Sequence, residues 1–152
     1  MAYHVGKDLR HWAPISVNCT CLRVRKAALA LTNHFESYLA PLNINSTQYS
    51  ILTVLDILEG SSVCQLAEII AMPRKTLTRH LKPLETRELI SIEQGFDKRE
   101  KTVTISDAGA DLIKQGRPLW ELAQSDMVER LGRQGWRQTH ELLEVLATIN
   151  DQ

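Results

Sequence analysis

The sequence has few cysteines, few aromatic residues and no long apolar run. Three cysteines among 152 residues, an odd number without a secretory leader, argue against a disulfide framework and indicate reduced thiols in a cytoplasm. The longest apolar run, SILTVLDIL, is interrupted by Asp56, so no segment is long enough to span a bilayer. The first ten residues, MAYHVGKDLR, lack the apolar core of a signal peptide. We expect a single cytoplasmic domain, since a chain of this length can bury one sizeable core.

Motifs of common enzymes and metal sites are also missing. The sequence contains no Gly-x-Ser-x-Gly, no phosphate-cradling glycine loop and no His-Glu-x-x-His. Its cysteines and its five scattered histidines match no familiar zinc-ligand spacing. These absences predict a protein that is not an enzyme and that needs no metal or other cofactor.

Charge is balanced overall but is unevenly distributed along the chain. Residues 1–26 carry 5 basic and 1 acidic side chains, and residues 27–72 carry 4 acids and no lysine or arginine. Residues 73–101 carry 8 basic and 5 acidic side chains, and residues 106–152 carry 5 basic and 8 acidic ones. The middle of the chain therefore presents a positive field, as a polyanionic partner requires. Ordinary solvated surfaces show a similar alternation of charge along the chain, so charge alone does not identify a polyanion-binding protein.

Apolar periodicity predicts four helices in the first part of the chain. The first is expected over residues 21–39, and the second runs from an N-cap among residues 45–47 to Gly60. A short third helix begins at Ser62, and the fourth is expected over residues 74–87. Two short alternating segments, 90–93 and 102–105, then predict a β-hairpin.

The last third of the sequence predicts a long helix and a terminal one. Ser106 is a suitable N-cap, and Gly116 and Pro118 are expected to bend the helix that follows. Residues 132–135, GRQG, separate it from a final helix with an apolar edge. The order of elements is that of a winged helix-turn-helix: a mainly α fold with a small β-hairpin.

The helix expected over 74–87 has two opposite edges. At about 100° per residue, its leucines gather on one side and its cations on the other. The members are Leu77, Leu81 and Leu84 on the first edge, and Lys75, Arg79 and Lys82 on the second. Thr76 and Thr78 flank the cations, where they could reach phosphates or a thymine methyl group. Such a helix fits the major groove of DNA, although an ordinary solvated helix can look the same in isolation.

The expected hairpin carries a cluster of charge at its tip. Lys98, Arg99 and Lys101 follow Asp97, which we expect to hold Arg99 in place. A guanidinium enters a narrow minor groove readily because it is planar and weakly hydrated. The hairpin thus favours a DNA-binding wing over its alternative, a surface hairpin with internal salt bridges.

Two stretches, TLTRHLKPLETRELI and DKREKTVTISDAG, resemble the MarR family of bacterial winged-helix regulators. The wing motif of that family is Asp-x-Arg, then a short strand and Leu-Thr-x-x-Gly. Asp97 and Arg99 match it, and Ile105, Ser106 and Gly109 stand in for the last three positions. The resemblance extends from about residue 21 to residue 149.

The resemblance implies a homodimer joined by helices at 20–42 and 107–150, with a winged helix-turn-helix DNA-binding region at 45–106. The terminal helix supports the dimer independently, because its apolar edge is larger than one small domain needs; the edge contains Leu142, Leu143, Leu146 and Ile149. Arg74 joins the recognition helix by resemblance. The candidate DNA-binding residues are Arg74, Lys75, Thr76, Thr78, Arg79, Lys82, Lys98, Arg99 and Lys101.

Three residues depart from the family pattern. Pro73 replaces the usual capping residue of the recognition helix and supplies no side-chain acceptor. Pro83 lies inside the same helix, where it removes one backbone hydrogen bond, and we expect a kink or 3₁₀ character there. Glu88 replaces the glycine that usually precedes the first wing strand, so we expect that turn to be tighter or displaced.

Candidate signal-sensing residues lie outside the winged helix. Cys19 and Cys21 precede the first helix beside Arg23 and Arg25, and a helix N-terminus with nearby cations favours a reactive thiolate. Their alternative role is packing at a dimer contact, and Cys64 is interpreted as structural. MarR-like proteins commonly bind small aromatic anions, and by resemblance the pocket candidates are Trp12, His34, Tyr38 and Trp120. Each is equally suited to packing.

The sequence thus predicts a homodimeric regulator that binds a palindromic operator in double-stranded DNA. We expect a repressor that a small aromatic ligand or cysteine oxidation releases. The alternative is a winged helix that binds protein and not DNA, since the fold alone does not dictate the partner.

Overall fold

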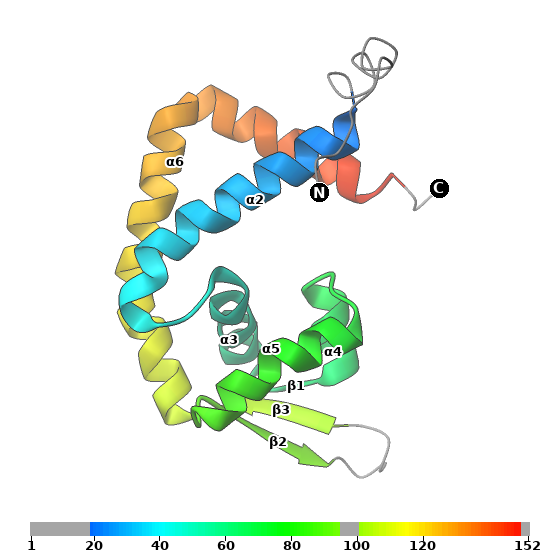
Figure 1. Cartoon of the computed structure of the whole chain (residues 1–152), viewed down its shortest axis with the longest axis vertical. Coiled ribbons are helices and arrows are strands. Elements are labelled where there is room, and N and C mark those ends of the chain that lie inside the picture. Colours follow the sequence, from blue (N-terminus) through cyan, green and yellow to red (C-terminus); the bar gives the residue numbers. More distant parts are fainter. Residues whose placement is uncertain (1–18, 95–100, 150–152) are drawn as a thin grey trace, which may run out of the picture. The chain divides into compact units, whose positions relative to one another are not determined.

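The structure is a computed structural model that describes residues 19–94 and 101–149 (Figure 1). The chain divides into two compact units, residues 1–34 and residues 35–152. The helix α2 (Thr20–Leu39) begins in the first unit and ends in the second. Its residues in the first unit are largely exposed, and Leu39 is its buried residue.

The second unit contains a winged helix and a long C-terminal helix. The order after α2 is η1 (Ala40–Leu42), α3 (Ser46–Leu58), β1 (Ser61–Ser62), α4 (Val63–Ile69), α5 (Arg74–Thr86), β2 (Ile90–Gln94), β3 (Lys101–Ile105) and α6 (Asp107–Ala147). The predicted fold class, mainly helical with a small wing sheet, is confirmed.

The core of the winged helix is aliphatic and comes from all of its layers. Its fully buried side chains include Ile51, Leu52 and Leu55 of α3, Leu66 of α4, Leu77, Leu81 and Leu84 of α5, and Val103 of β3. Burying each of these side chains stabilises the fold by about 1.5–3 kcal/mol. The leucine edge predicted for the recognition helix is therefore the side that anchors it.

Side-chain caps fix where two of the helices begin. Asn45 accepts a hydrogen bond from the Gln48 backbone at 2.8 Å, and the Gln48 side chain accepts one from the Asn45 backbone at 3.2 Å. This capping box selects Asn45 among the three predicted N-caps of α3. Ser62 caps α4 by accepting from the Gln65 backbone at 3.1 Å. The Gln65 side chain instead accepts from Ser61 at 3.2 Å, so only half of the expected capping box forms there.

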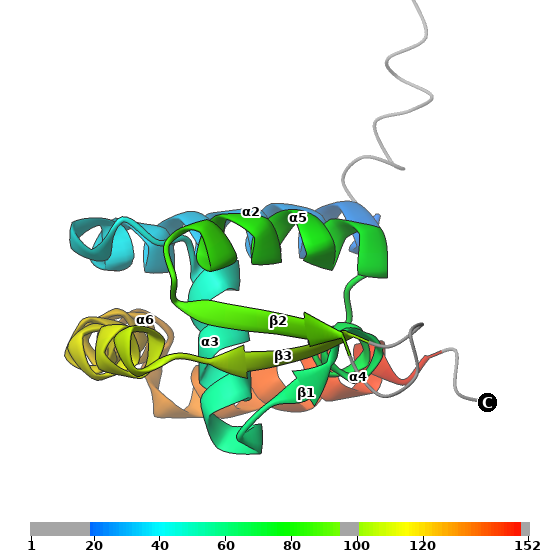
Figure 2. The same cartoon turned by 90° about the horizontal axis from the view of Figure 1, so that it is seen from below.

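The wing sheet has three antiparallel strands in the order β1-β3-β2, as Figure 2 shows. The predicted hairpin is present, with Ile92 opposite Val103. The strand β1 was not predicted, because Ser61 and Ser62 are too few to alternate and their partners, Val103 and Thr102, lie far along the chain.

Three helix ends in the winged helix use left-handed residues other than glycine, and the first is Glu59 after α3, with φ 55°. Ala71, after α4, has φ 52°, and Glu88, after α5, has φ 56°. Around Glu88 the bonds Glu88 N–H to Glu85 O (2.9 Å) and Leu89 N–H to Leu84 O (3.0 Å) form a Schellman motif. The displaced turn expected at Glu88 is therefore not observed, because glutamate adopts the conformation that glycine usually takes.

We predict that Ala71→Gly stabilises the protein by about 0.5–1 kcal/mol, since a Cβ is unfavourable at positive φ. Urea denaturation measures the change in the free energy of unfolding. Ala108→Gly, in the first turn of α6, is the matched control and should destabilise by a similar amount. A loss of stability in Ala71→Gly would contradict the prediction.

The helices tolerate their prolines, and α6 breaks at a glycine. The helix α5 continues through Pro83 to Thr86, so the expected kink does not end it. The carbonyl oxygen of Arg79, which loses its partner, lies on an exposed residue and can be hydrated. In α6, Gly116 and Pro118 keep helical angles, whereas Gly132 has φ 69° and ψ 157°. The predicted separation within 132–135 is confirmed, and the bend expected at Gly116 and Pro118 does not interrupt the helix.

Candidate nucleic-acid interface

The outward face of α5 is cationic and exposed. Arg74, Lys75, Arg79 and Lys82 are all exposed, whereas the leucine edge of the same helix is fully buried. The two edges predicted from the periodicity are therefore present in the structure, and the core fixes which side faces outward.

The cations of this face are not neutralised by neighbours. Among the described residues, no hydrogen bond or ion pair engages the side chains of Lys75, Arg79 or Lys82. On α6, by contrast, Lys114 pairs with Asp111 at 2.9 Å. The face of α5 thus keeps its charge available for a polyanion.

The first turn of α5 carries cations where a helix disfavours them. Arg74 and Lys75 occupy that turn, which holds no acidic residue, and Pro73 gives no side-chain cap, as predicted. The N-terminal end of a helix carries a partial positive charge, so each cation there costs about 0.3–1 kcal/mol. A local arrangement that lowers stability is expected at a functional site.

The two threonines on the flank of α5, Thr76 and Thr78, differ in the groups that they can present to DNA. The Thr78 hydroxyl donates to the carbonyl oxygen of Arg74 at 2.9 Å, so its proton is engaged within the helix. Thr78 is exposed, and with its proton engaged it offers a methyl group and oxygen lone pairs, which suit a thymine methyl group better than a phosphate. Thr76 is half-buried, and its N–H donates to Pro73 at 2.8 Å.

A cavity of about 620 Å³ lies between α5 and the wing sheet. It gathers four predicted DNA-binding residues, Arg74, Thr78, Lys82 and Lys101, and two acids, Glu85 and Glu93. Cys64 of α4, interpreted as structural, also lines it. Lys98 and Arg99 of the wing lie outside the described residues, so only Lys101 of the predicted wing cations is placed.

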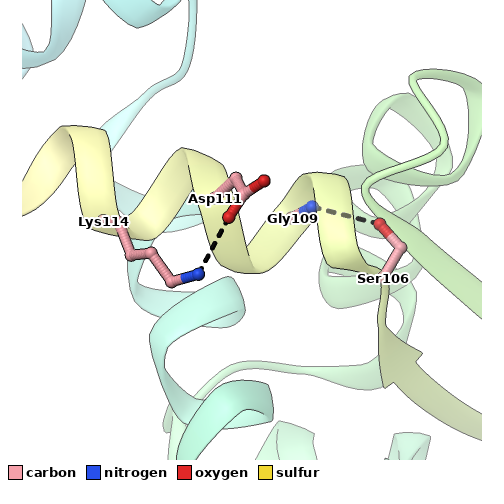
Figure 3. A network of polar contacts seen from close by, with 4 residues as sticks. All are labelled: Ser106, Gly109, Asp111 and Lys114. Carbon is pink, nitrogen blue, oxygen red and sulfur yellow. Dashed lines mark hydrogen bonds and ion pairs between the residues drawn. The ribbon is translucent and has the colours of Figure 1, made fainter.

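The base of α6 joins the wing to the rest of the unit. The Ser106 hydroxyl caps α6 by accepting from the Gly109 N–H at 3.0 Å (Figure 3). It also donates to the Glu88 carbonyl at 2.7 Å. One turn later, Lys114 donates to Asp111, and this bond raises the pKa of Lys114 (Figure 3). Two of the three residues that stand in for the family motif, Ser106 and Gly109, thus fix where α6 begins.

Tyr49 connects α3 to α6. Its hydroxyl donates to the Ile113 carbonyl at 3.3 Å, and burial raises its pKa above the ordinary value. Its ring packs on Gly116 so closely that no Cβ would fit there. Gly116, expected to bend α6, instead allows this close packing.

The predicted pocket residues are only partly brought together. Within the second unit, Trp120 packs against Phe35 with ring centroids 6.3 Å apart. Tyr38 donates to Asp126 at 3.4 Å. His34 is half-buried at the end of the first unit, and Trp12 lies outside the described residues. The contacts of Tyr38 and Trp120 fit packing, and their ligand role stays a prediction.

The three cysteines, Cys19, Cys21 and Cys64, are not joined by a disulfide in the structure. Cys21 is exposed in the first turn of α2, and Cys19 is half-buried just before it. The described residues contain no cluster of histidine, cysteine or acids able to hold a metal. None of their helices is long and apolar enough to cross a membrane.

One known family matches the middle of this chain, and solved structures resemble most of its length. Residues 44–101 match the MarR family. The transcriptional regulator MosR of M. tuberculosis, solved in complex with DNA, is 27% identical with a TM-score of 0.76, and the similarity covers 88% of this chain and 99% of that chain. No curated protein matches the sequence.

More distant structures share the fold. CouR, a transcriptional repressor bound to a DNA duplex, is 24% identical with a TM-score of 0.74, covering 89% of this chain and 94% of that one. A mutant MarR of E. coli, complexed with operator DNA, is 18% identical with a TM-score of 0.78, covering 87% and 96%.

Proposed function

We propose that this chain, whose residues 44–101 match the MarR family, is a member of that family and acts as a homodimeric transcriptional regulator that binds a palindromic operator. The observation that carries the proposal is the exposed, unneutralised cationic face of α5 opposite its buried leucines. A protein-docking winged helix would show an apolar or mixed surface at positions 75, 79 and 82. MarR-family members are transcription regulators, and the expectation that this chain is not an enzyme follows from that membership.

The C-terminal part of α6 supports the dimer. Beyond Ala123 no described residue of α6 is buried, although the helix carries many apolar side chains. The exposed ones are Leu131, Leu142, Leu143, Val145 and Leu146, followed by Ile149 after the helix. Many exposed apolar side chains on one helix are typical of a surface that packs against a partner. A second copy with twofold symmetry would present two α5 helices to two half-sites.

Selection of bound sequences from a random pool of duplex DNA tests the proposed function. The expected product is an inverted repeat whose half-sites are about one helical turn, 10–10.5 bp, apart. Pools without enrichment, even at low salt, would favour the protein-binding alternative.

The wing contributes a separate prediction. Arg99→Ala should weaken operator binding by about 1–3 kcal/mol, roughly tenfold to a hundredfold, because an arginine in the minor groove is lost. Fluorescence anisotropy measures the dissociation constant, and circular dichroism should show an unchanged fold. Unchanged affinity would show that the wing assignment is wrong. Lys114→Ala, on α6, is the charge-matched control.

The signal that releases the regulator from its operator is a separate proposal. We infer that the regulator is a repressor released by a small aromatic ligand near Tyr38 and Trp120 or by oxidation of Cys19 and Cys21. The exposure of Cys21 supports the second route, since a reactive thiol must be accessible. Alkylation of a Cys64→Ser variant, which leaves only these two thiols, should release the operator. Full binding after alkylation would exclude the oxidative route.

A further inference from the structure

Arg87, at the end of α5, makes the polar link from that helix to the segment that follows α2. Its Nη1 donates to the carbonyl oxygen of Asn43 at 2.6 Å, and its Nη2 donates to that of Leu42 at 3.2 Å. One guanidinium group thus donates hydrogen bonds to two consecutive backbone carbonyls, which lie 44 and 45 positions earlier in the chain. Although Arg87 belongs to the cationic stretch 73–101, its donors are directed at the protein.

Both partners of this link are held in place. Arg87 is the last residue before the left-handed Glu88, and its N–H donates to the Pro83 carbonyl at 3.1 Å. Asn43 is left-handed, with φ 51° and ψ 46°, and its N–H donates to Ala40 at 3.0 Å, which closes η1. Carbonyls at the end of a helix lack partners and attract a cation. The planar fork of arginine satisfies two of them at once.

The segment that accepts these hydrogen bonds, at Leu42 and Asn43, also contacts α6. A methyl group of Leu42 lies 3.2 Å from the position that a Cβ on Gly116 would take. Arg87 therefore joins the end of α5 to the point where η1 and α6 meet, and Leu42 at that point also packs against the leucine core of the winged helix. In the proposed dimer, α6 carries the surface for the partner copy.

We propose that Arg87 is a positioning residue that fixes the recognition helix relative to the base of the dimer-forming helices, and so sets the half-site spacing that the dimer accepts. This inference rests on the proposed function. A residue with this role touches no DNA, so its loss should change the tolerance of spacing and leave the number of phosphate contacts unchanged.

The test compares Arg87→Ala with the unsubstituted protein on duplexes whose half-site spacing is optimal, or longer or shorter by one and two base pairs. Affinity for the optimal duplex should fall roughly tenfold. Affinity for off-spaced duplexes should stay within a few-fold, so the preference for the optimum shrinks. Arg87→Lys keeps the charge but not the fork and should lie between the two. Arg117→Ala, an exposed arginine of α6, is the control and should keep the spacing preference.

Salt dependence distinguishes positioning from direct contact. The slope of log affinity against log salt should be the same in Arg87→Ala as in the unsubstituted protein. A slope reduced by about one per protomer with an intact spacing preference would make Arg87 a phosphate contact and overturn the inference.

A readout without DNA separates this inference from the proposed function. Amide hydrogen exchange over residues 40–44 should rise several-fold in Arg87→Ala and not in Arg117→Ala, because η1 loses its anchor. Unchanged exchange overturns the positioning role even if operator binding is intact. Failure of the unsubstituted protein to bind any duplex would instead overturn the proposed function. The hydrogen-exchange result would still test whether Arg87 holds η1 in place.

Discussion

Replacing both Lys75 and Arg79 with alanine is expected to weaken operator binding by about a hundredfold or more while the fold is kept. Each cation that meets a base or a phosphate contributes about 1–3 kcal/mol. Both side chains are exposed and have no described polar partner, so nothing in the fold depends on their charge. Removing Lys75 from the first turn also relieves an unfavourable interaction with the helix dipole.

Anisotropy titrations with the selected operator measure this loss, and thermal unfolding should shift by no more than a few degrees. The control variant removes Lys114 and Arg117 together, which gives the same change in net charge on α6. Equal losses in the two double variants would mean that only overall charge matters and that α5 is not the contact surface.

Gly109→Ala is expected to destabilise the protein by about 3 kcal/mol, since overpacking a well-packed site typically costs about 1–3 kcal/mol and here the obstacle is backbone. The new Cβ would overlap the carbonyl oxygen of Leu89 and would lie 2.7 Å from Cγ1 of Ile105. The Leu89 carbonyl cannot easily retreat, because it accepts the N–H of Ser106 at 3.1 Å. The wing and α6 would have to separate.

Gly135→Ala is the matched control, because the nearest described atom to its new Cβ is the Cβ of Leu131 at 3.7 Å, an ordinary contact. At a helical position this change should stabilise by about 0.5–1 kcal/mol. Urea unfolding measures both variants. The same small effect in each would show that the close packing at Gly109 is not required.

Regular periodicity made the recognition helix predictable. Leu77, Leu81 and Leu84 repeat at the helical period, and the cations of α5 fall opposite them, so both the buried and the exposed edge follow from the sequence. The caps of α3 and α6 were also readable, because Asn45 and Ser106 carry side chains that accept helix N–H groups.

Other features depend on contacts that local sequence does not encode. The strand β1 exists because Ser61 pairs with Val103, a partner far along the chain. The role of Arg87 depends on backbone carbonyls, which any residue could supply at positions 42 and 43. Ala71 and Glu88 adopt a conformation typical of glycine, so their residue types gave no sign of the left-handed backbone there.

The most direct test of the account is the affinity of the unsubstituted protein for its selected duplex between about 50 and 200 mM salt. We expect log affinity to fall linearly with log salt, with a slope of about −0.9 for each phosphate contacted, so that several contacts lower affinity by orders of magnitude. Absence of binding at 50 mM salt, or an affinity independent of salt, would contradict the assignment of α5 as a DNA-binding surface.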